Sequence, residues 1–316
     1  MLTLLELLSE HEDKVWCVQW SPNGELLASC GADKNIKIYK YDHKLKVARF
    51  IDTLQGHSKT VRSLSWSPCG SLIASASFDG TFVLGGTLHG HESEVKGCCW
   101  DKSGDLIATC GRDKMVWIYE INFDDIDASE CLEVLPGHSQ DVKFVAWHPN
   151  SGELYTCSYD DTIRYWHVEY DEWVCAGTLK GHSSTVWSLA FDNAGEYMAS
   201  CSDDTSIIIW KRIQSDSTPN KCLEWIQIHR IADHHKRCVY SISWSQHMGR
   251  DLIATACGDN MLRIFNMDKQ KLTTSLVQRI EAHKSDINCV CWNPIYTNII
   301  ATASDDRTVK LYELEI

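Results

Sequence analysis

The sequence predicts an all-β protein, a β-propeller of seven blades, on three observations. A histidine is followed nine residues later by tryptophan or phenylalanine at seven places along the 316 residues. An aspartate follows each pair, 22 residues after the histidine in the first five units, 24 in the sixth and 23 in the seventh. Each unit of about 45 residues holds short alternating apolar segments between turn residues, which is the pattern of one four-stranded blade. We expect residues 1–316 to form this propeller as a single domain.

The repeated positions have the following members. The histidine–aromatic pairs are His11/Trp20, His57/Trp66, His91/Trp100, His138/Trp147, His182/Phe191, His235/Trp244 and His283/Trp292. The aspartates are Asp33, Asp79, Asp113, Asp160, Asp204, Asp259 and Asp306. Six residues after six of these aspartates comes a further aromatic residue: Tyr39, Tyr119, Trp166, Trp210, Phe265 or Tyr312.

The repeated polar residues predict a hydrogen-bond network inside each blade. A histidine, a serine or threonine on the second strand, the aspartate of the next turn and the tryptophan of the third strand can satisfy one another. The fifth unit has the full set: His182, Ser200, Asp204 and Trp210. Each bond contributes about 1 kcal/mol, and an unsatisfied buried partner costs stability. A constellation that occurs seven times indicates architecture, so we expect no catalytic residue and no enzyme.

The two ends of the chain are expected to meet in the last blade. The final segment, VKLYELEI, is a third strand of the seventh unit. The segment from Leu2 to Leu8 has no repeat of its own. We expect it to add the fourth strand there, which would pair an otherwise open sheet edge.

The second unit is shortened. His91 follows Asp79 by only 12 positions, whereas His57 follows Asp33 by 24, and Gly85 stands where other units have an aromatic. About a dozen residues are missing, the length of a turn and one or two strands. We expect the second blade to have only three good strands or a distorted outer edge, in a ring that is otherwise intact.

Composition excludes several classes of function. A net charge of −13 argues against nucleic acid as the main partner. The chain contains no run of 18 apolar residues that would predict a membrane span.

Fifteen cysteines, an odd number in a long chain, indicate a reduced intracellular protein. Four of them lie three residues before a repeat aspartate and are expected to be small buried fillers: Cys30, Cys110, Cys157 and Cys201. No cysteine set has ligand spacing, so we expect neither a metal site nor a cofactor.

Two sets of residues are expected on the face of the propeller that carries the turns between second and third strands. One set directly precedes the repeat aspartates and includes Arg112. The other is the fifth residue after each histidine: Trp16, Arg62, Lys96, Lys143, Trp187, Tyr240 and Asn288. Four cations from consecutive units beside aromatics favour a site for an acidic or carboxylate-bearing peptide. An ordinary charged rim, with Arg112 paired to a nearby carboxylate, is the alternative.

The amino-acid sequence of the repeats resembles one family in particular. Segments such as SWSPCGSLIASASFDGT, ATCGRDKMVWIYE, HSQDVKFVAWHP, TLKGHSSTVWSLAFD and ASCSDDTS are similar to the WD-repeat subunit of the cytosolic iron–sulfur protein assembly (CIA) targeting complex. RDKMVW and DVKFVAWHP are not dictated by the fold. The resemblance extends over all seven units, and Arg112 matches the surface arginine of the family's RDK motif.

The resemblance implies a non-enzymatic adaptor of cytosol and nucleus. Its partners would be a MIP18-like small CIA subunit, a large helical-repeat CIA adaptor and Fe–S apoprotein clients that receive [4Fe–4S] clusters. Some relatives carry Leu-Tyr-Arg on the third strand of the fourth blade, which an Fe–S co-chaperone reads, but this chain has Tyr165-Trp166-His167. Direct docking of the co-chaperone by that route is therefore in doubt. The alternative function is another WD-repeat interaction scaffold, such as a histone- or degron-reading propeller.

Overall fold

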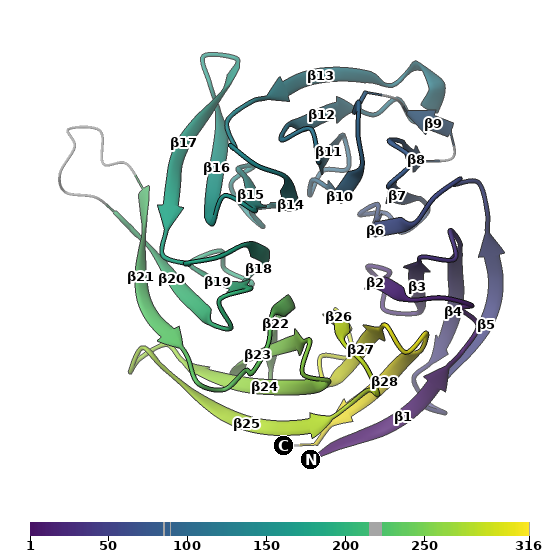
Figure 1. The fold of residues 1–316 in the computed structure, drawn as a ribbon, viewed down its shortest axis with the longest axis vertical. Helices are drawn as coiled ribbons and strands as arrows, with labels where there is room; N and C mark the ends of the chain where they lie inside the picture. Colours follow the sequence, from purple (N-terminus) through teal and green to yellow (C-terminus); the bar gives the residue numbers. More distant parts are fainter. Residues whose placement is uncertain (85, 89, 215–222, 316) are drawn as a thin grey trace.

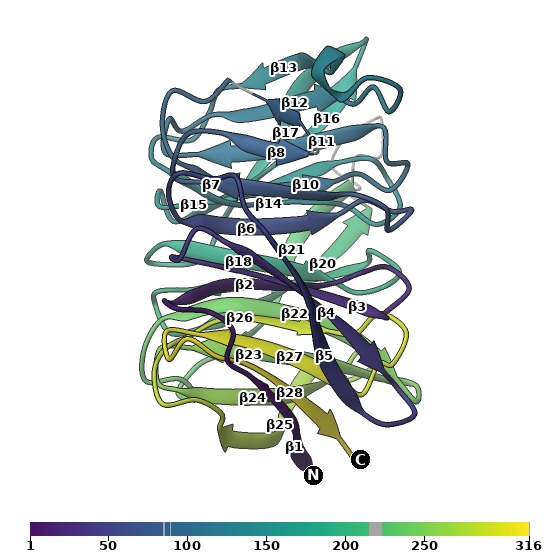
Figure 2. The same cartoon turned by 90° about the vertical axis from the view of Figure 1, so that its right-hand side faces the viewer.

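Seven four-stranded antiparallel sheets are arranged radially around a central opening (Figure 1). The computed structural model describes residues 1–84, 86–88, 90–214 and 223–315. The side view shows the sheets stacked with their strands running between the two faces of the disc (Figure 2). Among the described residues the one helical element is a short 3₁₀ turn, η1 (Ile126–Ala128). No helix in this part of the chain has the length and apolarity needed to cross a membrane.

Blades one to four follow one another along the chain, and each runs from the innermost to the outermost strand. Blade one is β2 (Val15–Trp20), β3 (Leu26–Gly31), β4 (Ile36–Asp42) and β5 (Val47–Leu54). Blade two is β6 (Val61–Trp66), β7 (Ile73–Ser77), β8 (Phe82–Leu84) and β9 (Gly86–Leu88). Blade three is β10 (Val95–Trp100), β11 (Leu106–Gly111), β12 (Val116–Glu120) and β13 (Glu130–Leu135). Blade four is β14 (Val142–Trp147), β15 (Leu154–Ser158), β16 (Thr162–Glu169) and β17 (Glu172–Lys180).

The remaining three blades complete the ring. Blade five is β18 (Val186–Phe191), β19 (Tyr197–Ser202), β20 (Ile207–Gln214) and β21 (Leu223–Ile231). Blade six is β22 (Val239–His247), β23 (Arg250–Cys257), β24 (Met261–Asp268) and β25 (Thr273–Glu281). Blade seven is β26 (Ile287–Trp292), β27 (Ile299–Ser304), β28 (Val309–Leu314) and the N-terminal strand β1 (Leu2–Leu8).

The N-terminal strand closes the ring as expected. β1 pairs antiparallel with β28, from Leu2 opposite Leu314 to Leu8 opposite Val309. Leu2 and Leu8 point into the core and are 7% and 5% exposed. Both chain ends therefore lie beside blade seven (Figure 1).

Blade two keeps four strands, but its outer half is reduced. β8 and β9 have three residues each, and β8 makes only two pairs with β7, namely Ala76 with Phe82 and Ser75 with Val83. The expectation of three strands is therefore wrong, and the expectation of an altered outer edge is confirmed. Gly85, which stands in the place of the repeat aromatic, lies outside the described residues.

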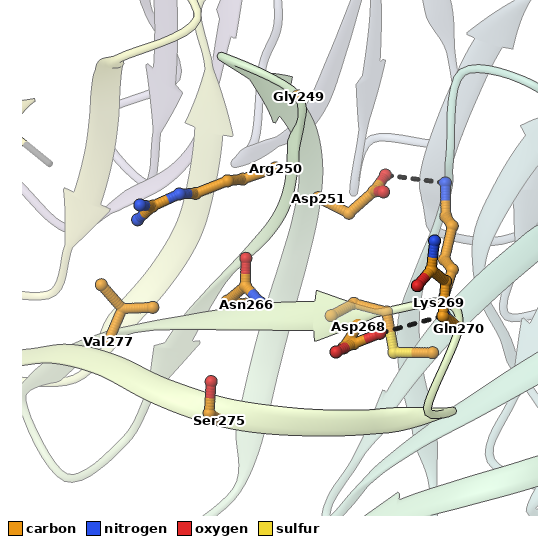
Figure 3. A pocket seen from close by; sticks show the side chains of 10 residues that line it. Gly249, Arg250, Asp251, Asn266, Asp268, Lys269, Gln270, Ser275 and Val277 are labelled. Atoms are coloured by element: carbon orange, nitrogen blue, oxygen red, sulfur yellow. Dashed lines mark hydrogen bonds and ion pairs between the residues drawn. The ribbon is translucent and has the colours of Figure 1, made fainter.

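The core consists of apolar side chains packed between neighbouring blades. One cluster joins Ile207 and Ile209 of blade five to Ile253 and Phe265 of blade six. At the periphery of the same interface, Lys269 of blade six pairs with Asp192 of blade five and with Asp251, at 2.8 Å in each case. Figure 3 shows this lysine and Asp251 beside a surface pocket of about 500 Å³. Burial opposes the charge of Lys269, but the two carboxylates outweigh it and raise its pKa.

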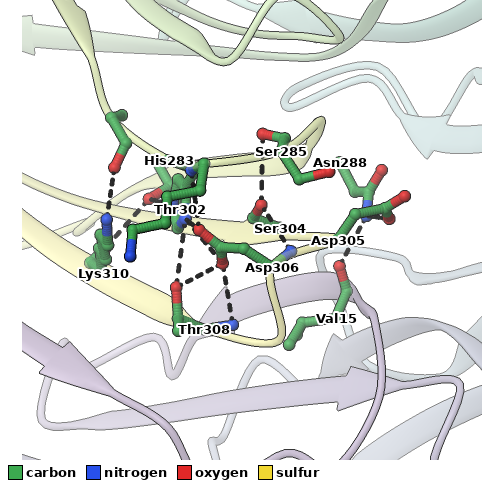
Figure 4. A network of polar contacts seen from close by, with 12 residues as sticks. Val15, His283, Ser285, Asn288, Thr302, Ser304, Asp305, Asp306, Thr308 and Lys310 are labelled. Atoms are coloured by element: carbon green, nitrogen blue, oxygen red, sulfur yellow. Dashed lines mark hydrogen bonds and ion pairs between the residues drawn. The ribbon is translucent and has the colours of Figure 1, made fainter.

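The predicted network is present inside the blades. In blade five, His182 hydrogen-bonds Asp204 (2.9 Å) and Ser200 (2.8 Å), and the indole of Trp210 donates to Ser200 (2.9 Å). Burial alone would raise the pKa of Asp204, but bonds from His182 and Ser206 bring it below its usual range. Figure 4 shows the corresponding network of blade seven, where His283 lies between Asp306 and Thr302.

Blade six departs from this pattern. His235 bonds Thr255 (2.9 Å), but its Nδ1 has no partner among the described residues. Asp259 instead pairs with Arg263, which is 2% exposed and donates to both carboxylate oxygens at 2.9 and 2.5 Å. Burial and the nearby charge of Arg263 lower the pKa of His235 to about 3. The prediction of seven equivalent histidine–aspartate contacts is wrong for this blade.

Candidate functional site

The turns between second and third strands lie beside the start of each first strand, at one end of the propeller that we call the top face. In blade three the backbone N–H of Arg112 donates to the carbonyl oxygen of Glu94 (2.9 Å). The residue before the repeat aspartate makes the same bond in the other six blades, where the donors are Ala32, Phe78, Tyr159, Asp203, Gly258 and Asp305. These bonds fix both predicted sets of residues at the same end of the molecule.

The second predicted set converges on one cavity. Trp16, Arg62, Lys96, Lys143, Trp187, Tyr240 and Asn288 all line a space of about 300 Å³ at the centre of the ring. Each side chain comes from the innermost strand of a different blade, at its second residue. Alternation along a strand points this residue away from the buried valine or isoleucine that precedes it. Spacing from the histidines therefore located the wall of the central cavity correctly.

The cations on this wall are only partly neutralised. Lys96 pairs with Asp141 at 2.6 Å and with Glu94 at 3.5 Å. Burial opposes its charge, but the hydrogen bond to Asp141 raises its pKa. The guanidinium of Arg62 lies over the ring of Trp16, 5.0 Å from the centroid. A cation on an aromatic face keeps its full charge, so this part of the cavity remains positive.

Lys143 has the least polar surroundings of the three. Its Nζ lies 3.4 Å from the ring centre of Tyr159 and 5.0 Å from that of Trp187, and the residue is 9% exposed. Burial, together with the charge of the neighbouring Lys96, lowers the pKa of Lys143 to about 7. A negative group entering the cavity would favour the charged amine, because an opposite charge stabilises it.

Aromatic rings form the other side of the cavity. Trp187 packs edge-on against both Tyr159 (5.8 Å between centroids) and Tyr240 (5.2 Å). The hydroxyl of Tyr240 donates to Asp286 at 3.4 Å, and Arg237 pairs with the same carboxylate at 2.9 Å. The cavity thus has one cationic and one aromatic side, an arrangement suited to a ligand that carries both a carboxylate and an apolar group.

Arg112 lies outside the cavity. Its side chain is 61% exposed and pairs with Glu94 at 3.4 Å, the kind of contact expected of an ordinary rim. Glu94 also contacts Lys96, so this carboxylate connects Arg112 to the cavity wall. Asp113, by contrast, belongs to the blade network and hydrogen-bonds His91 at 2.6 Å.

Several features of the site were missed by sequence reasoning. Tyr159 was expected to face solvent, but its ring supports Lys143. Five cysteines also line the cavity: Cys17, Cys98, Cys99, Cys289 and Cys291. Spacing from the histidines could have revealed them, because Cys17, Cys98 and Cys289 each stand one or two positions beyond a cavity residue.

The cysteines of the two inner strands of the blades pack as core residues, whereas Cys69, Cys131 and Cys175 are exposed. Cys30, Cys110, Cys157 and Cys201 are 0% exposed, which confirms the expectation that they fill the interior. Burial raises the pKa of Cys291 to about 12 and that of Cys99 to about 11, so these thiols remain protonated near neutral pH. In the part of the chain that the structure describes, no three histidine, cysteine, aspartate or glutamate side chains are grouped to hold a metal.

Comparison with known proteins agrees with this geometry. The family model "WD domain, G-beta repeat" matches seven segments: residues 2–40, 48–84, 82–120, 129–167, 173–211, 225–266 and 274–313. A relative from Culex quinquefasciatus, "Probable cytosolic iron-sulfur protein assembly protein Ciao1", is 42% identical over 99% of this chain and 98% of its own length. The chain belongs to the Ciao1 family of WD-repeat proteins.

Further relatives carry similar descriptions. "Probable cytosolic iron-sulfur protein assembly protein 1" of Candida albicans is 31% identical over 99% of this chain and 100% of its own length. The Ciao1 protein of Aedes aegypti is 42% identical over a shorter stretch, 46% of this chain and 45% of that relative. Membership of the family thus rests on alignments that include every blade.

Proposed function

We propose that the protein is a non-enzymatic adaptor of cytosolic iron–sulfur protein assembly, which docks apoproteins so that they receive [4Fe–4S] clusters in cytosol and nucleus. The names of the full-length relatives support assignment to this machinery. The proposed partners are a MIP18-like small subunit, a large helical-repeat adaptor and the apoprotein clients. Nucleic acid and membranes are not among them.

The observation that carries the docking role is the central cavity. Arg62, Lys96 and Lys143 converge there in a protein of net charge −13. Cations held side by side repel one another unless a negative group joins them. Trp16, Trp187 and Tyr240 add the rings most often found as binding anchors. The proposed ligand is an acidic or carboxylate-bearing peptide, with Arg112 at the edge of the same surface.

Affinity capture from cytosolic extract, followed by mass spectrometry, tests the proposal. Wild type would be compared with Arg62→Glu in the cavity and Arg112→Glu at its edge. Arg279→Glu, an exposed arginine on the outer strand β25, is the matched control. We expect the small subunit, the helical-repeat adaptor and Fe–S enzymes to be recovered with wild type and the control, and less of them with the two variants.

Other results would change the account in defined ways. Equal recovery with all four proteins would keep the adaptor role and place the site elsewhere. Histones or ubiquitin-ligase subunits in place of the expected partners would favour the alternative, a histone- or degron-reading propeller that uses the same face.

A further inference from the structure

One wall of the central cavity holds two lysine amines beside the same aromatic ring. The Nζ atoms of Lys96 and Lys143 lie 5.8 and 3.4 Å from the ring centre of Tyr159. The two lysines are the second residues of neighbouring inner strands, β10 and β14, and both line the cavity. Like charges so close together repel, so the pair is more stable when one of the two amines gives up its proton.

A carboxylate decides which of the two amines keeps its charge. Burial opposes the charge of Lys96, but its hydrogen bond to Asp141 (2.6 Å) raises its pKa. Lys143 has no ion pair in the described part of the chain, and its Nζ instead contacts the rings of Tyr159 and Trp187. Aromatic rings attract an ammonium ion less strongly than a carboxylate does. Lys143 is therefore the amine that is more easily neutral, and burial and the charge of Lys96 lower its pKa to about 7.

A neutral lysine amine in a cavity is a nucleophile. Its nitrogen carries a free electron pair, which an ammonium ion lacks, and lysines become reactive when they are desolvated or lie next to another cation. Both conditions hold for Lys143. Near pH 7 the neutral fraction of such a lysine is roughly a thousandfold larger than that of an ordinary exposed lysine.

The surroundings favour an electrophile that is small and becomes negative on reaction. Lys143 is 9% exposed, so a reagent has to reach it through the cavity of about 300 Å³. Arg62 and Lys96 line the same cavity and would stabilise an anionic product. Carbon dioxide meets both conditions, because it is small and its adduct with an amine, a carbamate, is an anion. An aldehyde would give an imine, which gains nothing from neighbouring cations.

We propose that Lys143 reacts reversibly with carbon dioxide and that Lys96 and Arg62 hold the resulting carbamate. The lone pair of Nζ forms the new N–C bond, while one C=O π bond of carbon dioxide breaks and its electron pair becomes the negative charge on oxygen. The nitrogen then releases one proton to solvent. In balance, R–NH₂ and CO₂ give R–NH–COO⁻ and H⁺, with no change of oxidation state and no further reagent.

The modification would act on the docking surface, a consequence that rests on the proposed function. A carbamate at Lys143 places a negative charge beside the cations that an acidic peptide would use, so carbon dioxide and peptide should compete. The reaction itself needs no partner protein. It can therefore be tested on the isolated chain, independently of whether the cavity docks a peptide.

Chemical trapping locates the carbamate. Protein equilibrated with ¹³C-labelled carbon dioxide near pH 7 would be treated with triethyloxonium ion, which converts a carbamate into a stable ethyl ester, and its peptides would be analysed by mass spectrometry. We expect the labelled adduct on Lys143 and none on Lys96, which Asp141 keeps charged. Lys14, which pairs with Asp305 at 2.6 Å, is the exposed control and should carry at least about tenfold less.

Carbon-13 NMR on intact protein gives a second readout. Lys143→Arg should lose a carbamate resonance that Lys14→Arg retains. At constant dissolved carbon dioxide, this resonance should grow in wild type as the pH rises through 7, because the reaction needs the neutral amine and releases a proton. The α-amino group of Met1 can also react, but trapping separates its peptide from that of Lys143. If Lys143→Arg does not fold, trapping on wild type still decides.

Three results would overturn the proposal. One is the absence of a trapped adduct on Lys143 of wild type. Another is an equal amount of adduct on Lys143 and Lys14, which would mean that the cavity confers no reactivity. The third is a full set of carbamate resonances in folded Lys143→Arg. None of them bears on the adaptor role, which the recovery of partner proteins tests separately.

Discussion

Two tyrosines at equivalent positions show what a single buried hydroxyl contributes. The hydroxyl of Tyr312 donates to the carbonyl oxygen of Ala282 at 2.8 Å, whereas that of Tyr119 is buried without a partner among the described residues. Tyr312→Phe should lower the free energy of unfolding by about 1 kcal/mol, because one hydrogen bond is lost while the Ala282 carbonyl still accepts from Lys310 at 2.7 Å. Tyr119→Phe should be neutral or stabilising. Denaturant titration of both variants checks this, and equal losses would contradict it.

His235 should make stability depend on pH in a defined window. Its pKa is about 3 in the folded protein and about 6.5 when unfolded. Between these values the unfolded chain binds the extra proton, so stability falls as pH falls from about 6.5, by at most about 1.4 kcal/mol per pH unit. Carboxylates contribute little above pH 5 because their unfolded pKa values are near 4.

Replacement of this histidine tests the window. Wild type should lose unfolding free energy as the pH falls from 6.5 to 5. His235→Gln should lose less over the same range, by at most about 1.4 kcal/mol per pH unit, which is the effect of one proton. His283, whose pKa is also lowered by burial, should leave some slope in the variant. Identical slopes for the two proteins, measured by denaturant titration at each pH, would show that His235 does not control this range.

The spacing of residues in the sequence predicted the polar networks of the blades but not the different pairing in blade six. Spacing alone identified His182, Ser200, Asp204 and Trp210, because the geometry of a blade fixes their separation. In blade six the histidine-to-aspartate distance of 24 was a visible irregularity. Sequence could not show that Asp259 pairs with Arg263 in place of His235, because spacing does not decide which of two possible partners a carboxylate takes.

At the scale of the strands, blade two should be the weakest part of the sheet system. β8 makes two pairs with β7, whereas β12 makes five with β11. Amides with fewer neighbouring hydrogen bonds and less buried surface open at lower free energy. Hydrogen exchange should be faster in residues 73–84 than in residues 107–120. Equal protection would mean that the short strands are as stable as the long ones.

The spacing between Asp79 and His91 predicted that blade two is shortened, but not how its outer strands are arranged. The 11 residues between Asp79 and His91 were too few for two ordinary strands. The structure shows instead that β8 and β9, with three residues each, still make a ladder, because a short hairpin needs only a few pairs. Residue counts therefore limited the size of the sheet, while strand pairing decided how the available length was divided.

At the scale of the whole molecule, β1 should control closure of the ring. Leu2 and Leu8 bury their side chains, whereas Leu4 on the same strand is 49% exposed. Leu8→Ala should lower the free energy of unfolding by about 2–5 kcal/mol, because it leaves a cavity at the joint between the chain ends. Leu4→Ala is the matched control and should change it by less than about 0.5 kcal/mol. Similar effects in thermal or denaturant unfolding would argue against closure by this strand.

The central cavity was predictable in position but not in chemistry. One register, the fifth residue after each histidine, placed Lys143 and Trp187 on its wall because all seven blades share the same geometry. The pairing of Lys96 with Asp141 joins blade three to blade four, whereas the ring of Tyr159 lies beside Lys143 within blade four. A repeat pattern gives positions along the chain and carries no information about which side chains meet across blades or within one.

The most direct test of the account measures iron–sulfur assembly itself. Cells depleted of this protein would receive wild type, Arg62→Glu or Arg279→Glu, and incorporation of radioactive iron into cytosolic Fe–S enzymes would be measured. We expect wild type and Arg279→Glu to restore incorporation and Arg62→Glu, present at the same level, to restore much less. Full restoration by Arg62→Glu would contradict the proposed role of the cavity, and no loss of incorporation on depletion would contradict the proposed function.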